Sequence, residues 1–135
     1  MPLLTWNDSF SVGVRAIDSQ HSTLVAILNE LYDAMMQGHA KEVTGPLLHK
    51  LIKYTREHFT AEEAMMSAAK YPGLAGHHRE HEKLTKQVGE YAVRFERGEC
   101  TVNIELLKFL RTWLTDHIQH TDKAYGPCLV QHGIH

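Results

Sequence analysis

The sequence has little of what marks several large classes of protein. It has two cysteines, Cys100 and Cys128, which form no C-x-x-C pair and are too few for a disulfide scaffold. No apolar run approaches the roughly 18 residues that a membrane span needs, and the N-terminus lacks the basic and apolar regions of a signal peptide. The net charge of -2 offers no basic surface. These shortages predict a cytoplasmic protein with neither nucleic acid nor membrane as a partner, and with reduced thiols.

Histidine is the residue type that the sequence has in excess. It occurs 11 times in 135 residues, whereas a typical level of roughly 2–3% would give about three. Four histidines and four glutamates fall within residues 58–84, HFTAEEAMMSAAKYPGLAGHHREHEKL. A charged solvent face is usually made of Lys and Glu. The concentration of histidine therefore indicates a role for the imidazole groups.

Amphipathic segments predict an all-α protein. We expect four helices, over about residues 19–38, 41–68, 75–97 and 103–125. Asp18 is the expected N-cap of the first helix, and Asn103 or Thr101 that of the last. The breaks between helices are expected at Gly38, at YPG (71–73) and at Gly98, and GP (126–127) is expected to end the last helix. Short connections between long helices favour an up-down-up-down antiparallel four-helix bundle.

The length of 135 residues suits a single domain with one core. Within it we expect an N-terminal arm over residues 1–18, the bundle over 19–125 and a frayed tail over 126–135. The arm has no helical periodicity but contains Trp6 and Phe10, so we expect it to be extended and pinned over the core. The bundle accounts for most of the chain, which favours carriage, storage or delivery of a ligand over sensing.

Titratable side chains interrupt the apolar face of every expected helix. His58 and Glu62 stand four residues apart, so both project from one helix face, one turn apart. The same is true of His77 and His81. His21 lies on the apolar face of the first expected helix. Buried imidazoles and carboxylates need a partner. A metal would supply one.

The fourth helix carries its two candidate ligands at a less regular spacing. His117 and Asp122 are five residues apart, which at about 100° per residue leaves them about 140° apart around the helix. We therefore expect either a local π-type turn or an Asp122 side chain that reaches sideways.

The candidate ligands comprise five imidazoles and two carboxylates. They are too many for one tetrahedral zinc ion and fit two metals that share the carboxylates. Nitrogen-rich donors without thiolate suit Fe, Cu or Zn, and shared carboxylates favour a pair of irons. The Glu-x-x-His pattern of carboxylate-rich di-iron bundles is absent from the inward faces. Because fewer anionic donors stabilise high-valent iron less well, O₂ should be bound and released and not cleaved.

Four segments resemble the signature blocks of the hemerythrin family, in its bacterial branch: DSQH (18–21), HFTAEEAMM (58–66), YPGLAGHHREH (71–81) and WLTDHIQHTDKAY (113–125). The resemblance implies two non-haem iron ions with an oxo or hydroxo bridge. It implies that one iron is bound by His77, His81 and His117. The other, with a place open for O₂, would be bound by His21 and His58, and the bridging carboxylates would be Glu62 and Asp122.

The function that the resemblance implies is reversible, non-enzymatic O₂ binding for carriage, storage or delivery, with an oxygen-consuming enzyme as recipient. Two alternatives stay open. One is a di-iron enzyme with peroxidase or nitric-oxide-handling activity, and the other is an iron-storage or metal-homeostasis protein.

Apolar residues beside the candidate ligands predict a dry O₂ pocket, in addition to their role in core packing. They are Leu24, Phe59, Trp113, Leu114 and Ile118. Leu114, one turn before His117, is the expected gate. Tyr71 and Tyr125 are interpreted either as hydrogen-bond partners of the centre or as packing at the end of the bundle. Surface positions are expected for Glu63, Glu80 and Glu82 and for the other histidines, His39, His49, His78, His120, His132 and His135.

Overall fold

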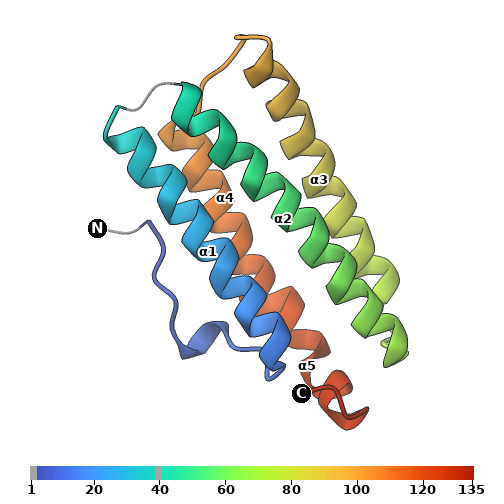
Figure 1. Ribbon diagram of the computed structural model, residues 1–135. Helices are drawn as coiled ribbons and strands as arrows, with labels where there is room; N and C mark the ends of the chain where they lie inside the picture. Colours follow the sequence, from blue (N-terminus) through green and yellow to red (C-terminus); the bar gives the residue numbers. More distant parts are fainter. Residues whose placement is uncertain (1–2, 39–40) are drawn as a thin grey trace.

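Four long helices lie side by side in the computed structural model, which describes residues 3–38 and 41–135 (Figure 1). They are α1 (Arg15–Met36), α2 (Lys41–Ala68), α3 (Leu74–Glu96) and α4 (Ile104–Asp116). The π-helix η2 (His117–Asp122) continues α4 into α5 (Lys123–Gln131), and the 3-10 helix η1 (Asp8–Phe10) precedes α1. No strand occurs in the described ranges. The predicted all-α, antiparallel four-helix bundle is confirmed.

The helices are held together by two apolar clusters. α1 packs against α2 and α4, and α2 packs against α3. A larger cluster fills most of the bundle and includes Leu28, Leu31, Leu48 and Leu107, all at most 1% exposed. A smaller cluster near α5 consists of Val12, Val14, Ile17, Met66, Ala69, Tyr125 and Leu129. The predicted inward-facing histidines and carboxylates lie, along the helices, where the larger cluster gives way to the smaller one.

The N-terminal arm is tied to the first helix by side chains. Asp18 was expected to be the N-cap, and this is wrong, because α1 begins at Arg15 and has Val14 at its N-cap. The Asp18 carboxylate instead accepts hydrogen bonds from the Ser11 hydroxyl (2.6 Å) and the Val12 N–H (2.9 Å). Its position in the first turn also suits the positive end of the helix dipole. Phe10, Val12 and Val14 are buried, so the arm covers the core.

The last helix ends later than the sequence predicts. Pro127 was expected to terminate it together with Gly126, but both lie inside α5 (Lys123–Gln131). Proline usually disrupts a helix interior. Here packing keeps the segment helical, because Tyr125 and Leu129 are fully buried in the smaller cluster. Gly126 is required there, since a Cβ atom would lie 2.4 Å from the carbonyl oxygen of Val12.

Other boundaries agree with the sequence. The Asn103 side chain accepts a hydrogen bond from the Leu106 N–H (2.9 Å), so Asn103 is the N-cap of α4. Gly38 and Gly98 follow α1 and α3 with φ of 72° and 73°, a conformation that favours glycine. Both cysteines are free thiols. Among the described residues, no helix has the length and apolar character that crossing a membrane requires.

Candidate metal centre

A π-helix brings the last two candidate ligands to one face. The backbone widens over His117–Asp122, which compensates for the 140° separation that a regular α-helix would give. Both side chains then point into the bundle, where they are at most 5% exposed. The π-type turn that the five-residue spacing suggested is therefore present.

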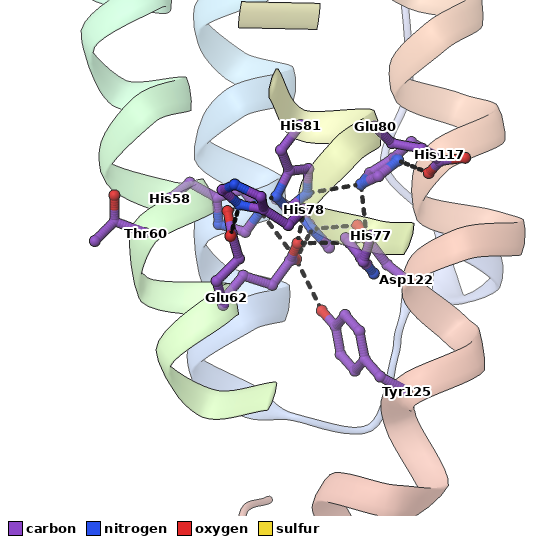
Figure 2. Close-up of polar contacts among 12 residues, drawn as sticks. His58, Thr60, Glu62, His77, His78, Glu80, His81, His117, Asp122 and Tyr125 are labelled. Atoms are coloured by element: carbon purple, nitrogen blue, oxygen red, sulfur yellow. Dashed lines mark hydrogen bonds and ion pairs between the residues drawn. The ribbon is translucent and has the colours of Figure 1, made fainter. Parts of the chain in front are cut away.

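The seven candidate ligands meet inside the bundle, and Figure 2 labels all of them except His21. α1 supplies His21, α2 supplies His58 and Glu62, α3 supplies His77 and His81, and η2 supplies His117 and Asp122. None of the seven is more than 5% exposed. They form two groups of potential ligand atoms, each within a span of 4.8 Å. The first group is Glu62, His77, His81, His117 and Asp122, and the second is His21, His58, Glu62 and Asp122.

The carboxylate of Glu62 faces both groups. Its Oε1 lies 3.1 Å from the Nε2 atoms of His77 and His81. Its Oε2 lies 3.2 Å from Nε2 of His58 and 3.3 Å from Nε2 of His21. One oxygen thus serves each group, which is the arrangement of a carboxylate that bridges two metal ions.

Asp122 repeats this arrangement from the opposite helix. Its Oδ2 lies 3.0 Å from Nε2 of His21, in the second group. Its Oδ1 lies 2.9 Å from the Nε2 atoms of both His77 and His117, in the first group. Although these contacts are short, neither Asp122 oxygen is aligned for a hydrogen bond. Buried carboxylate oxygens without hydrogen bonds are costly, and a cation between these groups would remove that cost.

The ring nitrogens give a second test of whether the residues fit metal. The Nδ1 of His81 lies 3.0 Å from an oxygen of Glu63, which can only accept, so Nδ1 carries a hydrogen and the neutral form of the ring presents a lone pair at Nε2. The Nδ1 of His117 lies 3.2 Å from Glu80, which favours the same tautomer. The two Nε2 atoms are only 3.0 Å apart. Two lone pairs at this distance repel each other unless a cation lies between them, so the donor set fits metal.

Without metal, protons take part of the role of the cation. Burial disfavours charged His21, but the carboxylates of Asp122 and Glu62 outweigh it and raise the pKa of His21 to about 9. The same balance raises the pKa of His77 to about 9. Burial would raise the pKa of Glu62 and Asp122, but their histidine contacts hold both below the usual range. At neutral pH the imidazolium groups of His21 and His77 therefore face two anionic carboxylates in the metal-free centre.

An apolar cavity of about 50 Å³ reaches the centre. His21, His58, His117 and Asp122 border it, whereas His77 and His81 do not. Of the five expected pocket residues, four line the cavity: Leu24, Phe59, Trp113 and Leu114. The fifth, Ile118, is completely buried but does not line it.

Two of the lining residues also stack on candidate ligands. The ring of Phe59 lies parallel to that of His81, with centroids 3.7 Å apart and an interplanar angle of 4°. Trp113 stacks on His117 at 4.4 Å and 14°. These aromatic rings fix the planes of two imidazoles and keep water from one face of each.

Several contacts of the centre were not predicted from the sequence. The amide oxygen of Gln20 lies 2.6 Å from Nδ1 of His58. Glu63 and Glu80, expected at the wet surface, contact His81 and His117. Gln20 and Glu63 each adjoin a candidate ligand in the sequence, which is a signal of proximity. Their actual partners lie on other helices, however, and no spacing rule identifies them.

The two tyrosines left open by the sequence have different contacts. The Tyr125 hydroxyl donates a hydrogen bond to Oε2 of Glu62 (2.8 Å), and burial, together with the charge of that carboxylate, raises the pKa of Tyr125. Tyr125 thus serves the centre as well as the smaller cluster. Tyr71 meets the ring of Tyr125 edge-on, with centroids 6.3 Å apart, and packs against the same cluster.

The remaining histidines lie at the surface where the structure describes them. His78 contacts Glu63 and Glu82, and His49 contacts Glu96 at 2.8 Å. The others in the described ranges, His120, His132 and His135, are exposed. His39 lies outside the described residues.

Comparison with known proteins agrees with this arrangement. The family model for the hemerythrin HHE cation binding domain matches residues 12–129. The chain belongs to the hemerythrin family. It is 38% identical over 130 residues to a bacteriohemerythrin of Methylococcus capsulatus, covering 96% of this chain and 98% of that protein. A bacteriohemerythrin of Pseudomonas aeruginosa is also 38% identical, over 93% of this chain and 80% of its own length.

A solved structure extends the likeness to three dimensions. A crystal structure of wild-type hemerythrin superimposes with a TM-score of 0.91 at 38% identity, covering 94% of this chain and 98% of that chain. The sequence resemblance to the hemerythrin family is thus confirmed over nearly the whole length of the chain.

Proposed function

We propose that this protein binds O₂ reversibly at a non-haem di-iron centre and serves in oxygen carriage, storage or delivery. The observation that carries the proposal is the position of Glu62 and Asp122, each of which turns one oxygen to either group of imidazoles. Membership of the hemerythrin family, for which the resemblance implies O₂ binding at such a centre, supports it.

The proposed ligands divide as the two groups do. His77, His81 and His117 would hold one iron, His21 and His58 the other, and Glu62 and Asp122 both. Iron would supply the electrons that O₂ binding requires. The first group offers five donor residues and the second four, so the second group would leave more room for O₂ at its iron. Both histidines of the second group, His21 and His58, border the apolar cavity.

The protein's contribution would be to orient the ligands and exclude water. Tyr125 and Gln20 hold Glu62 and His58 by hydrogen bonds of 2.8 Å and 2.6 Å. The residues that line the cavity are mostly apolar, which slows access of water, anions and protons to the centre. Leu114, half-buried on the wall, would act as the gate of this pocket. Such a site favours binding of O₂ over its consumption, so we propose a carrier and not an enzyme.

Cycling with O₂ tests this function. The iron-loaded protein is reduced under argon, exposed to O₂ and returned to argon several times while its visible spectrum and iron content are followed. We expect about two irons per chain and an absorption band that appears with O₂ and disappears under argon. A matched sample exposed to H₂O₂ tests peroxidase activity. Irreversible oxidation, peroxide turnover or many irons per chain would reject carriage in favour of a di-iron enzyme or iron storage.

A further inference from the structure

The outer ring nitrogens of the candidate ligands have unequal partners. In the first group, Nδ1 of His81 donates to the carboxylate of Glu63 at 3.0 Å. In the second group, Nδ1 of His58 donates to the neutral amide oxygen of Gln20 at 2.6 Å. The Nδ1 atoms of His21, in the second group, and of His77, in the first, have no hydrogen-bond partner among the described residues. Among the outer ring nitrogens, only Nδ1 of His81 thus donates a hydrogen bond to a carboxylate, and it lies on the side of the first group.

Glu63 is fixed at both of its oxygens. While Oε2 accepts from His81, Oε1 contacts Nδ1 of the exposed His78, whose Nε2 lies 2.8 Å from Glu82. The Glu63 side chain is only 23% exposed. Glu80, the other carboxylate on this side, is 51% exposed and lies 3.2 Å from His117, so water screens its charge more strongly. Glu63 is therefore the anionic partner best placed to act on the centre.

An anionic acceptor on one imidazole nitrogen increases the basicity of the other nitrogen. A more basic Nε2 stabilises the higher charge of an oxidised metal, and hydrogen bonding to ligands is an established means of setting a reduction potential. We propose that Glu63 is a positioning residue that, through His81, makes the iron of the first group the more readily oxidised of the two. This inference rests on the proposed di-iron function and concerns how the chain distinguishes its two irons.

The test compares three iron-loaded full-length proteins: wild type, Glu63→Gln and Glu82→Gln. Glutamine at position 63 keeps an oxygen acceptor for His81 but removes the charge. Glu82→Gln removes a charge from the exposed end of the same chain of contacts. The two one-electron oxidation steps are followed by anaerobic redox titration. For Glu63→Gln we expect the equilibrium constant of the first oxidation to fall about tenfold, a rise in potential of about 59 mV, with a smaller change in the second step. Glu82→Gln should leave both steps unchanged.

Three results would overturn the inference. Equal shifts of both steps would mean that Glu63 acts on the irons without distinction, and potentials like those of wild type would mean that its charge is not used. Loss of iron from a Glu63→Gln variant that melts like wild type would assign Glu63 to metal retention instead. In each case the wild type would still bind iron and O₂ reversibly, so the proposed function would stand. If the wild type itself holds no iron pair, the function and this inference both fall.

Discussion

The two sides of the centre share both carboxylates but differ in their surroundings. The imidazoles of His21 and His58 border the apolar cavity, and the hydrogen-bond partner of His58 is a neutral amide. His77 and His81 lie away from the cavity, and His81 is backed by the carboxylate of Glu63 and the ring of Phe59. The side of His21 and His58 thus has fewer donors, and both of its imidazoles border the apolar space. On the other side only His117 borders that space, and His81 has an anionic hydrogen-bond partner. The same set of residue types can in this way build a binding side and a supporting side.

Removal of a carboxylate that both sides share should weaken both iron sites and so abolish the difference between them. Glu62 is fully buried and faces four imidazoles, so Glu62→Ala should weaken the binding of both irons. We expect at least about a tenfold loss of iron affinity and loss of the O₂-dependent band. Iron content after gel filtration and absorbance spectra would measure this.

The matched control is Glu57→Ala, which removes an exposed carboxylate from the same helix. It should bind iron as the wild type does. Full iron content in Glu62→Ala would contradict the bridging role.

Opening the cavity should affect mainly the side of the centre that His21 and His58 form. Leu114 is half-buried on the cavity wall, and its truncation would admit water and anions to the side of His21 and His58. We expect Leu114→Ala to speed autoxidation and azide binding several-fold and to cost about 1–2 kcal/mol of unfolding free energy, below the range for a fully buried leucine. Stopped-flow absorbance and thermal unfolding would measure these effects.

Leu129→Ala provides the comparison for Leu114→Ala. Leu129 is fully buried in the smaller cluster and does not line the cavity, so this variant should lose stability without faster autoxidation. Unchanged autoxidation and azide-binding rates in Leu114→Ala would reject the gate.

Proton release on metal uptake should be the smallest of these effects, and it concerns both sides equally. His21 and His77, one from each group, have pKa values raised from 6.5 to about 9 in the metal-free fold. Metal displaces these two protons, so loading should release more protons per chain at pH 7 than well above pH 9, where His21 and His77 are already neutral. A pH indicator in weakly buffered solution would report the release.

The same pKa values give the metal-free protein a definite pH dependence. Because the folded pKa lies above the unfolded value, the protons stabilise the fold fully below about pH 6.5, and this contribution is lost as pH rises through about 9. Denaturant unfolding at pH 6.5 and 9.5 should show the lower stability at the higher pH. Equal or greater stability at pH 9.5 would contradict the protonation of His21 and His77.

The sequence predicted the parts of the molecule that follow from helical periodicity. Positions four apart, such as His58 and Glu62, share a helix face, and a five-residue spacing between inward residues predicts either a π-type turn or a side chain that reaches sideways. Contacts between segments follow no such rule. Asp18 satisfies the sequence pattern of an N-cap, but it binds the arm instead, and Pro127 is kept in a helix by packing. Glu63 reads as a surface residue because its own helix does not reveal that His81 faces it from the next one.

The most direct test of the central claim is to locate the metals in crystals of the protein. Anomalous diffraction recorded at the iron absorption edge should show two peaks of similar height. One should lie among His77, His81 and His117 and the other beside His21 and His58, with Glu62 and Asp122 in contact with both. A single peak, or peaks that follow the zinc edge, would contradict a di-iron centre in this chain.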